Sequence, residues 1–227
     1  NLSSIGVSHF RQRMHDDTPG QPRRGCAMFN CMIAVEEYLK SQTSPPMSAI
    51  NLRTGIYSGK GIKSGLLPLL LQRPALPLLT GDYGYLPLID GHDIGQAFAR
   101  AALLPNINGY LSLNIVGAET PQQKTVMQFL QQQMNNNHSR LISLPAIMAL
   151  PVHKLLSLIA CKQKTPLTTC AITASLTNPY MDNTQARQLL GYQPQISWQA
   201  SIEDFVAEFN KNNKVPALFV EEKEYTV

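Results

Sequence analysis

Short apolar runs alternate with segments of helical periodicity, and this alternation limits the fold more than any other feature of the sequence. The segment "MSAINLRTGIY" (47–57) is predicted to be a short buried strand that enters a Gly-rich turn. The segment "GYLSLNIVG" (109–117) carries an apolar run typical of a strand in a buried parallel sheet. Residues 26–42 and 197–212 have the apolar spacing of helices. Strands that alternate with helices predict an α/β fold with a parallel sheet.

Capping residues predict where several helices begin and end. The carboxylate of Asp93 is expected to cap the helix in "GHDIGQAFARAALL", and Thr120 is expected to cap a helix over 121–134. Asp182 and Gly191 are expected to begin and end the short helix in "DNTQARQLLGY".

The predicted sheet is small, since two or three strands are legible. A sheet of that size cannot be covered on both faces, so part of the architecture is expected to be absent. The chain also begins with Asn1 and not with Met, and we therefore expect a fragment or a trimmed product. Its first residues lack the basic start and apolar run of a signal peptide.

Composition narrows the class of protein further. The chain has 227 residues, of which 44% are hydrophobic and 15% charged, which is enough for a globular domain with a sizeable core. The net charge of +4 is spread thinly, and its one local concentration has no interleaved aromatic residues, so nucleic-acid binding is not expected. That concentration consists of Arg11, Arg13, Arg23 and Arg24, which fit a solvated or phosphate-facing loop.

The four cysteines give no metal-binding pattern. They are Cys26, Cys31, Cys161 and Cys170. None forms a Cys-x-x-Cys pair and no histidine stands at ligand spacing, so no metal site is expected. Buried free thiols in a reducing cytoplasm are the expected state, and we predict a cytoplasmic location.

Residues 141–161 form the longest apolar stretch and are predicted to be a helix. Prolines, His153 and Lys154 interrupt the stretch, and a membrane span needs about 20 largely uninterrupted apolar residues, so a span is not expected. A helix packed on its own domain is the favoured interpretation, and a helix lying on a membrane surface is the alternative. The alternative depends on a one-sided apolar stripe, which consists of Leu155, Leu156, Leu158 and Ile159.

The order of six motifs resembles the extended short-chain dehydrogenase/reductase family, the NAD(P)-dependent epimerases and dehydratases. The motifs are "SSIGV", "AVEEYL", "NLRTGIYSGKG", "PLIDGHDIGQAFARAAL", "GYLSLNIVG" and "DNTQARQLLGYQP". They cover nearly the whole chain in the family's order. The stretch 141–173 is most similar to members that reduce sterol-type or flavonoid-type ketones.

The resemblance implies an incomplete Rossmann-like parallel sheet, with its N-terminal half absent and with a small mixed α/β substrate-binding region. Residues 1–60 would form the C-terminal part of the nucleotide-binding domain, and residues 61–227 would form the substrate-binding region. Strand 109–117 and helix 121–134 would return from this region to the Rossmann sheet.

The cofactor implied by the resemblance is NAD or NADP. Thr54, Gly55 and Ile56 fall where family members pass their backbone beside the nicotinamide. The family's Gly-rich pyrophosphate loop does not occur in this sequence. The segment "GIYSGKG" fails the P-loop pattern, because its glycines are too close and no Ser or Thr follows Lys60.

The family moves a hydride to or from nicotinamide while a tyrosine transfers the matching proton and a lysine one helical turn later lowers the tyrosine's pKa. Ser4 matches the Ser/Thr that orients the substrate oxygen, although a serine that merely ends a strand is the equal alternative. When Glu36 is aligned with the family's glutamate, Met28 and Met32 occupy the tyrosine and lysine positions. Alignment on Glu37 instead places apolar residues there, namely Phe29 and Ile33. A thioether has no exchangeable proton, and we interpret the methionines as a core-facing stripe.

Two functions follow from these residues. The first is an epimerase, dehydratase or reductase with a degenerate site, in which His9 or His15, oriented by Asp16 or Asp17, is the weaker candidate for a replacement acid. The second is a non-catalytic relative that binds NAD(P) or a protein partner. The expected partners are a small-molecule substrate or a dinucleotide, and the resemblance implies a homodimer through the helix at 26–42.

Overall fold

The computed structural model describes ten stretches of the chain. They are residues 1–7, 14–22, 27–42, 48–63, 66–71, 75–80, 84–105, 107–134, 140–145 and 181–214. The sequence predictions for His9, for the arginines at 11, 13, 23 and 24, and for three of the cysteines lie outside these stretches.

A three-stranded parallel sheet lies at the centre of one half of the molecule. Its strands are β1 (Leu2–Ser4), β2 (Ala49–Thr54) and β6 (Tyr110–Ile115), in the order β1-β2-β6. The register pairs Ser4 with Thr54 and Thr54 with Ile115, so the three strands end level with one another. This sheet confirms the predicted α/β class and both of the strands read from the sequence.

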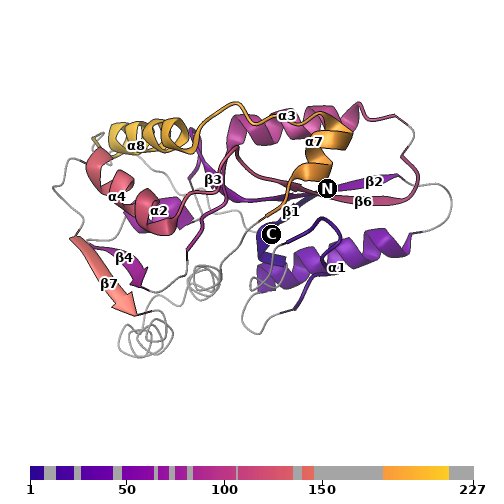
Figure 1. Ribbon diagram of the computed structural model, residues 1–227, viewed down its shortest axis with the longest axis horizontal. Helices are drawn as coiled ribbons and strands as arrows, with labels where there is room; N and C mark the ends of the chain where they lie inside the picture. Colours follow the sequence, from indigo (N-terminus) through magenta and orange to yellow (C-terminus); the bar gives the residue numbers. More distant parts are fainter. Residues whose placement is uncertain are drawn as a thin grey trace, which may run out of the picture.

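Helices cover both faces of this sheet (Figure 1). Helix α1 (Ala27–Ser41) packs on one side, next to β1 and the 3-10 turn η1 (Ile5–Val7). Helices α3 (Gly91–Ala102) and α7 (Thr184–Leu190) pack on the other side, against β2 and β6. The helix expected over 26–42 is therefore confirmed.

The two faces of the sheet differ in chemistry because side chains alternate along each strand. Toward α3 and α7 the sheet presents Leu52, Leu113 and Ile115, each at most 1% exposed, which form an apolar core with Ala97 and Leu190. Burying one such side chain stabilises the fold by about 1.5–3 kcal/mol. The opposite face carries buried polar residues instead, and α1 packs on it. They are Ser3, Asn51, Arg53, Ser112 and Asn114.

The other half of the molecule contains two short parallel sheets, with the helices α2 (Leu66–Leu71), α4 (Gln123–Gln133) and α8 (Trp198–Lys214). Strand β3 (Ile56–Ser58) pairs with β5 (Leu88–Asp90), and β4 (Ala75–Thr80) pairs with β7 (Arg140–Pro145).

An apolar core joins α2, α4, α8 and β5, and Ile56 of β3 packs against it. Its fully or nearly fully buried members are Leu67, Leu71, Leu86, Leu88, Val126, Met127, Leu130, Ile202, Phe205 and Val206. The rings of Phe129 and Trp198 meet edge to face at 5.3 Å and join α4 to α8. The helix expected at 121–134 thus exists as α4, but its main contacts are with α8, β4 and β7 and not with the β1-β2-β6 sheet. The buried apolar residues of α4, namely Val126, Met127 and Leu130, belong to this core, and this explains why α4 packs here and not on the β1-β2-β6 sheet.

The predicted N-terminal caps of α3 and α4 are wrong. The cap of α3 is Asp90, whose side chain accepts a hydrogen bond of 2.8 Å from the His92 amide. Asp93 is completely buried and accepts hydrogen bonds from the amides of Gln195 and Ile196, so it holds a distant loop. Helix α4 begins after Gln122 with no side-chain cap, and Thr120 lies outside it.

The ends of α7 agree better with the sequence. Gly191 ends the helix with a φ of 59°, the left-handed conformation that glycine adopts without cost, as predicted. At the other end Asn183, and not the predicted Asp182, occupies the cap position, although Asp182 accepts a hydrogen bond of 2.9 Å from the Thr184 amide.

Residues 140–145 are a strand and not the start of a helix, which corrects the reading of 141–161. Pairing with β4, which is remote in sequence, decides this conformation. The apolar stripe at 155–159 lies outside the described residues. Among the helices that the structure describes, none is long and apolar enough to cross a membrane.

Candidate functional site

The carboxyl ends of β1, β2 and β6 meet at one edge of the sheet, which is where open parallel α/β sheets bind ligands. Ser4 is half-buried at the end of β1, and its hydroxyl accepts a 3.3 Å hydrogen bond from the Gly6 amide. Thr54 is its register partner on β2. The structure therefore brings Ser4 and Thr54, two of the residues singled out in the sequence, to neighbouring positions on adjacent strands.

Helix α1 carries the two methionines near its start. Met28 is 46% exposed, and Met32 is half-buried. The prediction of a core-facing methionine stripe is wrong for Met28, because Ile33 and Glu36 are the buried residues of this helix. Neither thioether can donate a proton.

A buried ion pair fixes the rotation of α1 about its axis. Glu36 and Arg53 are 2% and 0% exposed, and two hydrogen bonds of 3.1 Å and 2.5 Å join their side chains. Ser3 donates a 2.6 Å hydrogen bond to the same carboxylate. Burial alone would raise the pKa of Glu36, but the hydrogen bonds from Arg53 and Ser3 and the charge of Arg53 lower it overall. Glu37 is exposed.

Arg53 also holds the segment that precedes α1. Its guanidinium donates to the backbone carbonyls of Asp16 and Thr18, at 3.3 Å and 2.7 Å. A single buried cation thus joins β2, α1 and the 14–22 segment.

The polar groups of Thr54, Gly55 and Ile56 are used within the chain. The Thr54 hydroxyl donates to the Ser3 carbonyl at 3.1 Å and lies 2.9 Å from the Tyr57 hydroxyl. The amides of Gly55 and Ile56 donate to Ile115 and Pro87, at 3.0 Å and 2.7 Å. A side chain on Gly55 would collide with the Pro87 carbonyl, so close packing explains this glycine. These donors are therefore not free to bind a dinucleotide, and the three residues do not fit a role in which they would hydrogen-bond to one.

Three titratable residues lie near the β6 end of the sheet. The exposed His15 ring is 3.9 Å from the Asp182 carboxylate, and among the described residues no side-chain hydrogen bond joins it to Asp16 or Asp17. Asp16 is buried and accepts a hydrogen bond from the Asn114 amide. Burial raises the pKa of Asp16 to about 6, and the nearby Asp182 adds to the rise, against the backbone hydrogen bonds and Arg53.

A tyrosine–lysine contact does occur in the structure, but not at this edge. The Lys40 ammonium lies 5.2 Å from the centre of the Tyr110 ring. Tyr110 pairs with Ala49, five residues before Thr54, which places it about 16 Å from the strand ends. The pair is too distant from Ser4 to serve as its proton relay.

Cys31 is a free thiol on α1, as expected, but it is exposed and not buried. It precedes Met32 on the outer side of the helix, away from Ile33 and Glu36.

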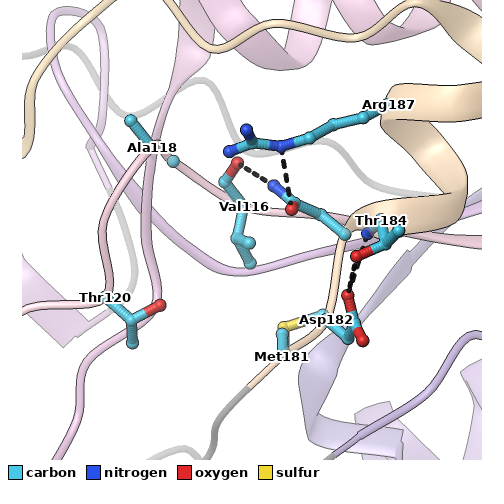
Figure 2. Close-up of a pocket in the computed structure, with 9 residues that line it drawn as sticks. Val116, Ala118, Thr120, Met181, Asp182, Thr184 and Arg187 are labelled. Atoms are coloured by element: carbon cyan, nitrogen blue, oxygen red, sulfur yellow. Dashed lines mark hydrogen bonds between the residues drawn. The ribbon is translucent and has the colours of Figure 1, made fainter.

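A polar pocket of about 330 Å³ opens beyond the end of β6 (Figure 2). Its lining comes from the segment after β6 and from the start of α7. The lining residues are Val116, Gly117, Ala118, Thr120, Met181, Asp182, Asn183, Thr184 and Arg187.

Sequence reasoning missed the Glu36–Arg53 pair, the burial of Asp16 against Asn114 and the pocket around Arg187. A signal for the first was present, since Arg53 interrupts an otherwise uncharged strand segment and Glu36 follows Ile33 on the inward side of α1. Asp16 and Arg187 belong to segments that meet through non-local contacts, and no local pattern marks them.

A parallel sheet with helices on both faces defines a Rossmann-like α/β protein. No protein-family model matches the chain, and no curated protein matches it. Solved structures do match its fold. A dTDP-glucose 4,6-dehydratase from Bacillus anthracis in complex with NAD superposes with a TM-score of 0.61 and 13% identity, over 94% of this chain and 61% of that one.

Two further solved structures agree. The dTDP-glucose 4,6-dehydratase DesIV from Streptomyces venezuelae has a TM-score of 0.63 and 15% identity, over 94% of this chain and 60% of that one. A UDP-glucose 4-epimerase from Thermotoga maritima has a TM-score of 0.61 and 13% identity, over 93% and 63%. The chain thus spans about three-fifths of the length of these enzymes, and the likeness shows the fold.

Proposed function

We propose that this chain belongs to the NAD-dependent epimerase/dehydratase family and carries a degenerate hydride-transfer site. Its fold is shared with nucleotide-sugar dehydratases and epimerases, two of them described in complex with NAD. The order of its motifs resembles the same family. The substrate class by resemblance is a small molecule with a hydroxyl or ketone group, such as a nucleotide sugar or a sterol-like or flavonoid-like compound.

The burial of Glu36 is the observation that carries this proposal. Glu36 is buried in the ion pair with Arg53, whereas Glu37 faces solvent. This supports the alignment in which Met28 and Met32 occupy the tyrosine and lysine positions. Loss of a positioned acid or base typically lowers a rate by about 10²–10⁴.

Ser4 keeps the position from which it would orient a substrate oxygen. Bound NAD(P) would supply the hydride acceptor in such a site, but Thr54, Gly55 and Ile56 offer it no free donor. We therefore assign these residues no step in a reaction and propose for them at most apolar contact with a dinucleotide.

Measured hydride transfer tests the proposal. We expect the purified chain, supplied with NAD or NADP and with UDP-glucose or dTDP-glucose, to transfer no hydride above background, whether or not the dinucleotide binds. Turnover that persists in a Met28→Ala, Met32→Ala variant would overturn it, because another group would then carry the proton.

A matched pair of variants tests the alignment. The double variant Met28→Tyr, Met32→Lys should place a phenol and an ammonium one helical turn apart at the strand edge, and this should lower the pKa of the new phenol in an ultraviolet titration. The control, Phe29→Tyr with Ile33→Lys, places the same groups on the packed side of α1 beside Gly6 and Gly20 and should destabilise the fold. The reverse result would favour the Glu37 alignment.

An apolar stripe on α1 favours the second candidate, a relative that acts through protein contacts. Met28, Val35 and Tyr38 are 46%, 43% and 63% exposed, and their spacing places them on one face of the helix. We propose that this face forms a homodimer.

Light scattering should therefore report a dimer that Val35→Glu and Tyr38→Glu dissociate. Leu103→Glu, at an 81% exposed leucine beyond α3, should leave the dimer intact. A monomeric chain, or equal effects of all three substitutions, would contradict the dimer.

A further inference from the structure

The pocket beyond β6 lies at the ligand-binding edge of the sheet but is separate from the Ser4 site. Its lining begins at Val116, directly after the last residue of β6, and β2 lies between β6 and β1. Neither Ser4 nor either methionine of α1 lines it. A ligand held there needs no dinucleotide and no proton relay.

Arg187 gives this pocket a positive charge with unused donors. Its Nε donates a 3.1 Å hydrogen bond to the Asn183 side chain, which holds the guanidinium over the pocket (Figure 2). Within the described part of the chain, its terminal nitrogens have no hydrogen-bond or ion-pair partner. A guanidinium with free terminal nitrogens is suited to bidentate contact with a phosphate or carboxylate.

Thr120 adds a hydroxyl on the opposite side of the same hollow (Figure 2). It does not cap α4, and no described residue hydrogen-bonds to its side chain. This hydroxyl can donate to, or accept from, a ligand in the pocket.

Asp182 determines which anions fit. Its carboxylate lines the pocket and accepts hydrogen bonds from the amide and the hydroxyl of Thr184, at 2.9 Å and 2.5 Å. A ligand that carries hydroxyl groups beside its anionic group can donate a hydrogen bond to this carboxylate, whereas a bare anion has no donor to offer it.

The size of the pocket agrees with such a ligand. Its volume of about 330 Å³ lies at the lower end of the range for small-molecule sites, roughly 300–1,000 Å³, and exceeds the volume of one phosphate. The polar lining disfavours an apolar metabolite.

We propose that the pocket binds a small polyhydroxylated anion, with the anionic group on Arg187 and hydroxyl groups directed toward Thr120 and Asp182. The proposal goes beyond the family function and stands independently of it, since it requires neither NAD(P) nor catalysis.

Titration calorimetry on the purified chain tests it with four probes: glucose 6-phosphate, gluconate, inorganic phosphate and glucose. We expect one of the two hydroxylated anions to bind, and the better of them to bind more tightly than phosphate or glucose. Comparison of glucose 6-phosphate with gluconate identifies the anionic group. Absence of binding by both, or equal binding of inorganic phosphate, would overturn the ligand class.

Variants place the binding in this pocket. Arg187→Gln should weaken the binding about 10- to 100-fold, since a charged hydrogen bond is lost, and Arg187→Lys should recover part of it. Lys211→Gln removes the same charge from an exposed position on α8 outside the pocket and should have no effect. Unchanged affinity in a folded Arg187→Gln protein would overturn the proposal. Shifts of the Thr120 and Ala118 amide resonances on titration of the wild-type protein give a readout that needs no variant, and their absence would contradict it.

Discussion

At the scale of single residues, the polar side of the sheet depends on charges that are buried in pairs. Arg53 is completely buried and is satisfied by Glu36 and by two backbone carbonyls. A buried pair of this kind adds little net stability compared with apolar residues of the same shape. Removal of one partner is costly, because the other charge is then left uncompensated.

Glu36→Gln should therefore lower the free energy of unfolding by about 3–5 kcal/mol, because Arg53 loses its counter-charge. The urea midpoint should fall while the slope of the transition is unchanged. Glu37→Gln makes the same change on the exposed neighbour and should stay within about 0.5 kcal/mol of wild type. Equal effects of the two substitutions would show that α1 is rotated differently from the structure described here.

The raised pKa of Asp16 predicts that the stability of the fold depends on pH. Its folded pKa of about 6 exceeds the unfolded value near 4, so its contribution is present below about pH 4 and is lost as the pH rises to about 6. The facing charged groups are Asp182 and Arg53. Asp16→Asn keeps an oxygen acceptor for the Asn114 amide and should be more stable than wild type above pH 6, by up to about 3 kcal/mol.

Urea unfolding of both proteins between pH 4 and pH 8 measures this difference. The two curves should converge near pH 4. A constant difference across the range would mean that Asp16 is not the titrating group.

At the scale of elements, α1 docks on η1 by close contact. A Cβ on Gly6 would collide with the ring of Phe29, so the two elements approach closely only because residue 6 is a glycine. By contrast, a Cβ on Gly95, on the exposed side of α3, would meet nothing within 4 Å.

Gly6→Ala should thus destabilise the protein by about 1–3 kcal/mol through overpacking. Gly95→Ala should stabilise it by up to about 1 kcal/mol, since alanine is the better helix former. Addition of Phe29→Leu to Gly6→Ala should recover part of the loss, which a double-mutant cycle measures. Effects of the same sign at both glycines would contradict the docking.

The elements also show what the sequence could predict. Strands β2 and β6 and the helices α1, α3, α7 and α8 agree with the sequence reading, because their apolar spacing reports the face that each buries. The predicted cap of α3 is wrong by three residues. Asp90 and Asp93 are equally suitable caps in the local sequence, but Asp93 accepts hydrogen bonds from the amides of the loop at 195–196 instead. Strands β4 and β7 were missed, because pairing between residues about 65 apart leaves no local signal.

At the scale of the whole molecule, the apolar cores and the buried Glu36–Arg53 pair stabilise the fold, so the fold does not depend on a proton-transferring tyrosine and lysine. None of these uses the positions of Met28 and Met32. The chain thus has the fold of an epimerase or dehydratase, whereas its chemistry has to be argued from the site.

The candidate site could be predicted from the sequence only in part. Ser4 and Thr54 could be placed at strand ends from the sequence, and the parallel register pairs them. Other features depend on contacts between segments that are remote in sequence. These features are the hydrogen bonds from residues 54–56 to Ser3, Ile115 and Pro87, and the pocket at Arg187. No motif in the sequence encodes those contacts.

The rate of hydride transfer tests the central claim most directly, measured in single turnover on this chain with a nucleotide-sugar epimerase assayed alongside. The account predicts a rate lower by at least about 10²–10⁴ than that of the epimerase, because we propose that Met28 and Met32 replace the tyrosine and lysine that transfer the proton. A rate within about tenfold of the epimerase, retained after Met28→Ala and Met32→Ala, would contradict it.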